Sequence, residues 1–348
     1  MRNSIAIIGS GLISQWHTYG YNKISEYYKD VKVAKKLICS RNITRERADE
    51  LGWEETESDW AAVVKRSDID IIDISASDHL HFPIAKAAIE NGKKIICEKP
   101  LTNFADEARE ITEMADSKNI KGAVCTNNRY VHAVRCIKHL IDSDEIGDIC
   151  HVYGSYKMDW ALGCQEPLPW RLDGSISPNG VLGDLGTHLI DICYFLGLEF
   201  GYVSGIQEAF ICANPSANDV CVFNARFNNG ALGVFEMSRV SGGGSGMVLE
   251  IHGTKSSVRW EKNHINILRI HNNNKAGERA YKRVHETKIL PYDYKWKHDF
   301  TLFDSFTLLL YDFLTGNGRT PTLSDGLKCC RVVTAVLQSC AEKRFVAL

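Results

Sequence analysis

Short apolar runs alternate with helix-length amphipathic segments through the first third of the chain. The runs predict strands over residues 5–8, 33–39, 69–74, 94–97 and 122–125. The segments between them predict helices over residues 12–27, 44–51, 59–66, 83–91 and 103–117. Strands that alternate with helices of this length are typical of a parallel, doubly wound sheet. We therefore expect an α/β domain of the Rossmann type over residues 1–125.

The pattern changes after residue 125, where a helix over 131–142 is followed by a series of strands. These strands are predicted over residues 150–158, 202–209, 221–227, 232–239, 247–253 and 257–260, and two helices over 302–314 and 323–341 close the chain. Asn228-Asn229-Gly230 marks a hairpin turn, and Asn272-Asn273-Asn274 with Gly277 marks a polar loop. A chain of 348 residues is long enough for two domains. We expect residues 126–348 to form an α+β domain with a large, mostly antiparallel open sheet.

A glycine-rich turn, Gly9-Ser10-Gly11-Leu12-Ile13-Ser14, joins the first predicted strand to the first predicted helix. Gly9 permits the tight turn, and Gly11 lets the backbone approach a pyrophosphate at the helix N-terminus. Ser14 stands where the dinucleotide-binding motif has Gly or Ala, and we expect it to loosen helix–strand packing slightly. The turn predicts a dinucleotide-binding domain, with Leu12 and Ile13 among the residues at the cofactor.

The choice between NAD and NADP depends on the residues after the second strand. An acidic residue there would bind the ribose 2′-hydroxyl of NAD. This chain has Ser40 and Arg41 instead, with Arg45 one turn later, and a hydroxyl with an arginine suits a 2′-phosphate. We favour NADP on this ground. The alternative is that Arg41 is a solvated surface charge and that NAD is used.

A second glycine-containing stretch, residues 180–191, runs into an apolar helical pattern that extends to about residue 196. Asp184, His188 and Asp191 are spaced to share one face of that helix. A carboxylate one turn before an imidazole can fix the tautomer of the ring and raise its basicity, which suits a general acid and base. The alternative is a helix capped by Asp184 with His188 as a core histidine.

Glu98-Lys99-Pro100 follows the strand over residues 94–97. A lysine at the carboxyl end of that strand can stabilise negative charge on a substrate oxygen. Together with the glycine-rich turn, Asn128-Arg129 and the stretch Asp184-Leu185-Gly186-Thr187-His188-Leu189-Ile190-Asp191, this motif resembles the Gfo/Idh/MocA oxidoreductase family over nearly the whole chain. The resemblance implies that Lys99, Asp184 and His188 are catalytic, and that His81 lies in the loop after the fourth strand. The residues assigned to the cofactor are Gly9, Gly11, Leu12, Ile13, Ser40, Arg41, Arg45, Ser75, His81, Glu98 and Lys99.

Further segments resemble the inositol and anhydrosugar dehydrogenase branch of that family, namely Asp159-Trp160, Pro169-Trp170-Arg171, residues 249–254 and Asp325-Gly326. A polyol site needs aromatic faces and polar groups that bind hydroxyls. The substrate-binding candidates are Arg129, Tyr156, Trp160, Trp170, Arg171, Asp184, His188 and Asp191. Each of the flanking residues is equally consistent with a place in the core or at the rim. Residues 177–180 depart from the glycine run that the family often has before its aspartate, which leaves the substrate open.

Composition removes several other classes of function. The net charge is −2 without a basic run, which argues against nucleic-acid binding, and no apolar run approaches the roughly 20 residues that span a bilayer. We expect no signal peptide, because the strand-like run over residues 5–8 begins directly after the N-terminal residues. The 12 cysteines are scattered and form no Cys-x-x-Cys, which indicates reduced thiols in the cytoplasm. His79 and His81 lack partners at metal-ligand spacing, so we expect no metal site, and His17 is expected to pack or cap locally.

These observations predict an NAD(P)-dependent dehydrogenase that acts on a secondary alcohol of a cyclic polyol or sugar. His188 would remove the hydroxyl proton, Lys99 would stabilise the oxygen, and Asp184 would orient His188. The resemblance also implies a homodimer or homotetramer formed through the C-terminal sheet. Two alternatives are a keto-sugar reductase that acts on a nucleotide-linked or phosphorylated sugar, and a non-catalytic dinucleotide-sensing or structural protein.

Overall fold

The computed structural model describes residues 2–164, 169–211, 217–244, 246–273, 279–283, 299–317 and 320–348. The chain forms two compact units: residues 1–127 with 302–330, and residues 128–301 with 331–348. The first change of unit lies close to the expected boundary at residue 125. Residues 302–330, however, pack with the first unit, whereas the sequence places them in the second domain. An amphipathic helix shows that one of its faces is buried, but it does not show which sheet or helix covers that face.

The first unit is built on a six-stranded sheet in the order β3-β2-β1-β4-β5-β6, with every neighbouring pair parallel. The strands are β1 (Arg2–Ile8), β2 (Lys32–Cys39), β3 (Glu55–Glu57), β4 (Ile71–Ile74), β5 (Lys94–Cys97) and β6 (Gly122–Val124). This order confirms the predicted doubly wound fold. The short edge strand β3 is missed by the sequence analysis because Glu55-Thr56-Glu57 carries no apolar pattern.

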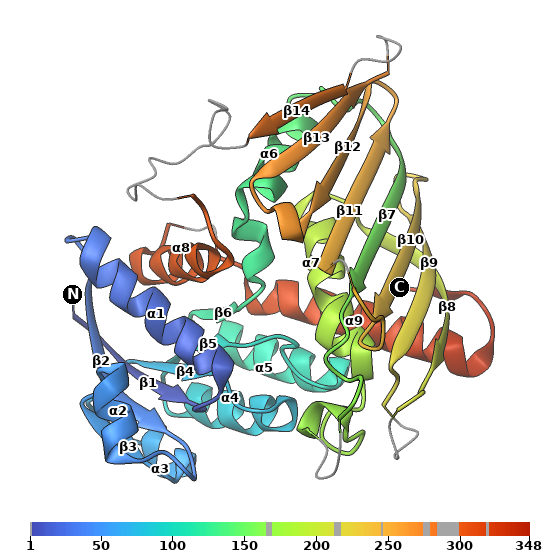
Figure 1. The fold of residues 1–348 in the computed structure, drawn as a ribbon. Helices are drawn as coiled ribbons and strands as arrows, with labels where there is room; N and C mark the ends of the chain where they lie inside the picture. The colour runs from blue at the N-terminus through green and yellow to red at the C-terminus, as the bar shows by residue number, and fades with distance from the viewer. Residues whose placement is uncertain are drawn as a thin grey trace. The chain divides into compact units, whose positions relative to one another are not determined.

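Helices cover both faces of this sheet (Figure 1). The helices of the unit are α1 (Leu12–Tyr27), α2 (Arg45–Leu51), α3 (Trp60–Val63), α4 (His81–Glu90), α5 (Ala105–Ser117) and α8 (Leu302–Thr315). Thr44 and Asp59 are the N-caps of α2 and α3, and their side chains accept hydrogen bonds from the backbone N–H groups of Arg47 and Ala61. The ring of Trp16 in α1 packs edge-on against Phe303 and Phe306, so the late helix α8 is held by aromatic contacts.

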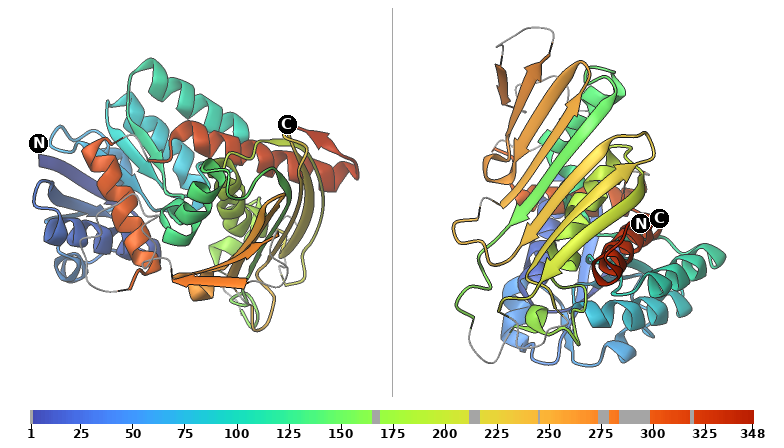
Figure 2. Two further views of the ribbon diagram at one scale, coloured as in Figure 1. Left: turned by 90° about the horizontal axis from the view of Figure 1, so that it is seen from above. Right: turned by 90° about the vertical axis from the view of Figure 1, so that its right-hand side faces the viewer.

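The second unit is built on a nine-stranded sheet in the order β14-β13-β12-β11-β7-β10-β9-β8-β15. Its strands lie side by side in the right-hand view of Figure 2, and all neighbouring pairs are antiparallel except β7 with β10. This confirms the predicted mostly antiparallel sheet. The strands are β7 (Ile149–Lys157), β8 (Phe200–Glu208), β9 (Val220–Phe227), β10 (Leu232–Ser238), β11 (Gly246–Gly253), β12 (Ser256–Glu261), β13 (Ile267–Asn272), β14 (Arg279–Arg283) and β15 (Val346–Ala347).

One face of the large sheet is covered by α6 (His132–Asp142), α7 (Thr187–Phe195) and the later part of α9 (Leu323–Glu342). Phe223 and Phe235 stack in the core beneath these helices with ring centroids 4.7 Å apart. The predicted turn at Asn228-Asn229-Gly230 joins β9 to β10, with Gly230 at a φ of 91°. The predicted polar loop lies partly outside the described residues, which include Asn272 and Asn273 but not Asn274 or Gly277. Within the described ranges, no helix has both the length and the apolar character that crossing a bilayer demands.

Candidate active site

The glycine-rich turn connects β1 to α1 in the way that a dinucleotide site requires. Gly9 has a φ of 128°, and a Cβ there would lie 2.5 Å from the carbonyl oxygen of Ser75, so only glycine fits. A Cβ at Gly11 would meet no described atom within 4 Å, which leaves the backbone at the start of α1 open to a ligand. In the part of the chain that the structure describes, no side chain caps this end of α1. The first amide groups of the helix, including those of Leu12 and Ile13, are therefore suited to bind a phosphate.

Ser14 links α1 to the sheet through its side chain. Its side chain is buried, and its Oγ lies 2.8 Å from Oγ of Ser75, which follows β4. The hydroxyl pair joins the helix to the sheet where the motif has a third glycine. A side-chain hydrogen bond thus stands where the motif has a third glycine, and the expected loosening stays a prediction.

The residues after β2 are only partly arranged as a 2′-phosphate site would need. The hydroxyl of Ser10 in the glycine-rich turn donates to Oγ of Ser40 at 2.9 Å, which brings the end of β2 against the turn. Arg41 is exposed. The guanidinium of Arg45 pairs with Asp49 one turn along α2 and donates to the carbonyl oxygen of Glu54. Arg45 is thus engaged by Asp49 and Glu54 in this structure, and the assignment of Ser40, Arg41 and Arg45 to the cofactor stays a prediction.

His81 is buried and is the first residue of α4 rather than part of the preceding loop. Its Nδ1 lies 2.7 Å from the carbonyl oxygen of Pro100, and its Nε2 lies 3.1 Å from that of Ala76. The contact with Pro100 ties the start of α4 to the segment that follows Lys99. The assignment of His81 to the cofactor stays a prediction.

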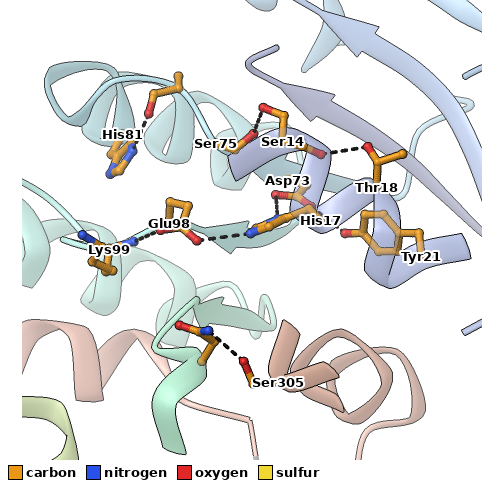
Figure 3. A network of polar contacts seen from close by, with 12 residues as sticks. Ser14, His17, Thr18, Tyr21, Asp73, Ser75, His81, Glu98, Lys99 and Ser305 are labelled. Carbon is orange, nitrogen blue, oxygen red and sulfur yellow. Dashed lines mark hydrogen bonds and ion pairs between the residues drawn. The ribbon is translucent and has the colours of Figure 1, made fainter. Parts of the chain in front are cut away.

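Lys99 is half-buried and follows Glu98 directly after β5. Its backbone N–H donates to Oε2 of Glu98 at 3.1 Å (Figure 3), and its peptide bond with Pro100 is cis. Glu98 itself is buried. The carboxylate that accepts from the Lys99 N–H therefore lies in the interior of the first unit.

His17 belongs to a buried network of polar side chains and does not pack locally as expected. Its Nδ1 lies 2.9 Å from both carboxylate oxygens of Asp73 in β4, and its Nε2 lies 3.1 Å from Oε1 of Glu98. The Tyr21 hydroxyl donates to Asp73 at 2.6 Å. Figure 3 shows these groups converging from α1, β4 and the end of β5. The sequence gives no signal for the network, because the two carboxylates lie 56 and 81 positions along the chain from His17.

The stretch that contains Asp184 and His188 is not a single regular helix. Residues Leu182–Gly186 form a π-helical turn, and α7 begins at Thr187. Gly180 precedes them with a φ of 51°, where a Cβ would lie 2.6 Å from the backbone of Asn218. Asp184 and His188 are both half-buried, so both side chains keep some access to solvent. π-helical turns often occur at functional sites.

His188 is held from one side by an amide. Nδ2 of Asn128 lies 2.9 Å from Nδ1 of His188, and the ring of Tyr156 lies beside the imidazole with centroids 5.9 Å apart. Asp184 pairs with Arg171, whose Nε lies 3.6 Å from Oδ1. Asn128 belongs to the Asn128-Arg129 motif, but the sequence does not assign it as the partner of His188.

Asp191 and Arg129, both predicted to bind substrate, form a bidentate ion pair. Nε and Nη2 of Arg129 donate to the two oxygens of Asp191 at 2.7 and 2.6 Å, and both side chains are buried. Asp191 therefore differs from Asp184 and His188, which are partly exposed. The geometry supports a role in holding α7 against the segment after β6.

The remaining substrate candidates lie around a second buried pair. Arg239 pairs with Asp219 at 2.7 Å, donates to the backbone carbonyl of Arg171 at 2.7 Å, and lies 5.7 Å from the ring of Trp160. The guanidinium of Arg171 stacks on Trp170 at 4.2 Å. Lys262 donates to the hydroxyl of Tyr156 at 2.8 Å. The sequence analysis missed Arg239, Asp219 and Lys262, which carry no motif.

Lys99 and the cofactor candidates belong to the first unit, and Asp184 and His188 belong to the second. The candidate residues of each unit are held by contacts within that unit. The first unit offers an open helix N-terminus behind a glycine turn, and the second unit offers a partly exposed imidazole anchored at Nδ1. These are the groups that hydride transfer with proton exchange requires.

Each of the two units matches a known protein family. Residues 3–126 match the oxidoreductase family with an NAD-binding Rossmann fold, and residues 134–259 match the GFO/IDH/MocA C-terminal domain. An oxidoreductase domain protein from Kribbella flavida is 30% identical, with a TM-score of 0.93 over 100% of this chain and 99% of that chain.

Levoglucosan dehydrogenase of Pseudarthrobacter phenanthrenivorans is 28% identical over 379 residues, which cover 99% of this chain and 97% of the relative. A solved structure of levoglucosan dehydrogenase in complex with NADH and levoglucosan has a TM-score of 0.93 and 28% identity, over 100% of this chain and 99% of that chain. The similarity therefore extends over both units.

Proposed function

The chain belongs to the Gfo/Idh/MocA oxidoreductase family, whose first domain binds NAD, and from this we propose that it oxidises a secondary alcohol of a cyclic polyol or sugar. The observation that carries the proposal is the partly exposed His188, anchored through Nδ1, in a chain whose Rossmann unit has an open glycine turn. The similarity to a levoglucosan dehydrogenase supports a cyclic sugar as the substrate class.

The residues of the first unit fit a nicotinamide dinucleotide. Gly9 and Gly11 shape the turn, and the first amides of α1 suit the pyrophosphate. When bound, the nicotinamide would accept the hydride from the substrate carbon. Lys99 would donate a hydrogen bond to the substrate oxygen and stabilise its alkoxide character.

His188 takes the hydroxyl proton in this mechanism, and Asp184 stabilises the resulting imidazolium. For Nε2 to exchange the proton, Nδ1 must keep its own proton and donate it to an acceptor. A rotation of the Asn128 side-chain amide by half a turn exchanges the positions of its oxygen and nitrogen. Oδ1 then faces Nδ1 of His188 and serves as this acceptor. Among the described residues this buried oxygen has no hydrogen-bond partner, whereas the amide nitrogen faces His188. We therefore assign Asn128 a positioning role through the tautomer of His188.

Each finer feature of the proposed enzyme is supported by a single observation. A preference for NADP rests on Ser40 and Arg41 alone, since Arg45 is engaged within α2. Assembly through the large sheet is supported by apolar side chains on its outer face, where Tyr202, Ile206 and Leu232 are 53%, 73% and 55% exposed. A cytoplasmic location is supported by the described cysteines, which are thiols and not disulfides.

The proposal is tested by mixing the purified chain with NAD or NADP and a panel of cyclic polyols, sugars and anhydrosugars. We expect at least one member of the panel to give reduced nicotinamide, followed by its absorbance. Initial rates with the two cofactors then decide between NAD and NADP. Activity confined to nucleotide-linked or phosphorylated keto-sugars would replace the proposed substrate class, and cofactor binding without turnover on any member would favour a sensing role.

A further inference from the structure

His17 lies in the core of the first unit with both ring nitrogens against carboxylates. Asp73 faces Nδ1 at 2.9 Å, and Glu98 faces Nε2 at 3.1 Å (Figure 3). An ionised carboxylate only accepts hydrogen bonds, so with Asp73 and Glu98 both ionised each ring nitrogen carries a proton. The arrangement therefore defines a buried imidazolium with two negative partners.

The surroundings of His17 favour the charged ring. Burial is the largest single influence and lowers the pKa of His17, but the charges and hydrogen bonds of Asp73 and Cys125 together outweigh it and hold that pKa well above its usual value. The hydroxyl of Tyr21 gives Asp73 a further hydrogen bond, the thiol of Cys125 lies close by, and the ring of Phe306 from α8 packs at 5.3 Å. Two buried carboxylates without this cation would repel one another in a medium that screens charge poorly.

Glu98 connects this cation to the backbone of Lys99. Oε1 faces His17, and Oε2 accepts the N–H of Lys99 at 3.1 Å. The carboxylate thus has a contact at each oxygen, one with the ring of His17 and one with the amide of Lys99. The chain of contacts runs from α1 through Glu98 to the residue that follows β5.

We propose that His17 is a permanently charged positioning residue, which holds Glu98 so that its second oxygen fixes the backbone from which Lys99 reaches the substrate. The catalytic consequence rests on the proposed function of Lys99. The structural part, a buried imidazolium that orders the amide of Lys99, stands independently of that function.

A metal ion is the competing interpretation of the same cluster. A ring nitrogen of His17, a carboxylate oxygen of Glu98 and Sγ of Cys125 all lie within 4.8 Å of one another. A metal would need an unprotonated ring nitrogen and a thiolate. Both ring nitrogens instead face hydrogen-bond acceptors, and burial raises the pKa of the Cys125 thiol to about 12. The cluster is therefore better described as a hydrogen-bonded cation.

The charge of His17 is measured directly by NMR of the protein labelled with ¹⁵N in its histidine rings. We expect one ring to remain an imidazolium from mildly acid to mildly alkaline pH, and its signals to disappear in His17→Gln. His139→Gln, which changes an exposed histidine of α6, is the matched control and should leave the signals of the imidazolium in place. A neutral His17 at neutral pH, or a stoichiometric metal ion that is lost with Cys125→Ser, would overturn the proposal.

The positioning role is tested with His17→Gln, Glu98→Gln and the double variant. In Glu98→Gln the new side chain keeps an oxygen that can accept the N–H of Lys99, and its amide can donate to a neutral ring of His17. Glu98→Gln should therefore fold even if His17→Gln does not.

We expect the Lys99 amide resonance to shift and exchange faster in His17→Gln, with kcat reduced roughly tenfold to hundredfold and the cofactor dissociation constant unchanged. Glu98→Gln should shift the Lys99 amide resonance less than His17→Gln does, because the glutamine side chain keeps its contact with the Lys99 N–H. The kcat of the double variant should be no lower than that of His17→Gln, because His17 acts on Lys99 through Glu98.

These readouts separate the inference from the proposed function. If the wild type oxidises no polyol or sugar, the proposed function fails, whereas the NMR experiments still decide the state of His17 and of the Lys99 amide. If His17→Gln and Glu98→Gln leave both the Lys99 amide and kcat unchanged, His17 has only a structural role and the inference is wrong.

Discussion

His17 and His188 show how the surroundings of a residue set its chemistry. His17 is fully buried between two carboxylates and is held as a cation. His188 is partly exposed, and the amide beside it can hold either tautomer of the ring. A ring that must gain and lose a proton near neutral pH needs the second environment. This contrast supports His188 as the acid and base and argues against His17 in that role.

Asn128→Asp tests the positioning of His188. A carboxylate at this place would accept the proton of Nδ1 and stabilise the imidazolium, so the pKa of His188 should rise. Oxidation needs the neutral ring, and the acidic limb of the kcat/KM profile should therefore move to higher pH. The measurement is kcat/KM against pH for the wild type and the variant. An acidic limb that stays in place would show that Asn128 does not act on His188.

His17 also predicts a dependence of stability on pH. Its pKa in the folded chain lies well above the value of about 6.5 expected in the unfolded chain. The stabilisation from its protonation is therefore complete below that unfolded value and is lost as pH rises through the folded pKa. Urea unfolding of the wild type should show stability falling over this window. His17→Gln should lack this component of the fall, and identical pH dependence in the two proteins would contradict the assignment.

Individual elements are predictable where apolar periodicity is regular, as in α1, whose bounds agree with the expected helix over residues 12–27. Short or irregular strands are not, because β3 and β15 span only three and two residues, and the late strands β13 and β14 show no regular alternation of apolar and polar positions. The π-helical turn at Leu182–Gly186 has the sequence pattern of an ordinary helix, since its residues fit either form. Sequence patterns report local preference and burial, and these elements are decided by tertiary pairing.

The candidate site is predictable only as far as its motifs reach. The glycine turn and the Lys99, Asp184 and His188 positions carry recognisable spacing. The pairing of Arg129 with Asp191 is not predictable, because the sequence does not indicate which of the many acidic residues an arginine contacts in space. Asn128 and Glu98, likewise, gain their roles only from their contacts in space.

Gly9→Ala and Gly11→Ala form a matched pair for the turn between β1 and α1. A methyl group at Gly9 would collide with the carbonyl of Ser75 at a φ that disfavours alanine, so we expect lower thermal stability and loss of cofactor binding. Gly11→Ala meets open space among the described residues and should keep its melting temperature while binding the cofactor more weakly. Calorimetry and cofactor titration measure both quantities. Equal effects of the two substitutions would contradict this division.

At the scale of the whole molecule, the large sheet leaves one face with exposed apolar side chains. Tyr202 and Ile206 lie on β8, and Leu232 lies on β10, level with Tyr202 across the intervening strand β9. Ile206→Glu should lower the mass measured by light scattering if a second copy covers this face. Phe104→Glu, a change of the same kind at an exposed residue of the first unit, is the control and should leave the mass unchanged. An unchanged mass in Ile206→Glu would exclude this part of the sheet as the interface.

The central claim is that this oxidoreductase transfers hydride from a cyclic polyol or sugar with His188 as the base. Its most direct test compares the wild type and His188→Asn for reduced nicotinamide formed from the substrate panel, with cofactor affinity measured in parallel. We predict turnover by the wild type and a kcat lower by about 10²–10⁴-fold in the variant, at unchanged cofactor affinity. Turnover by His188→Asn at the rate of the wild type would contradict the account.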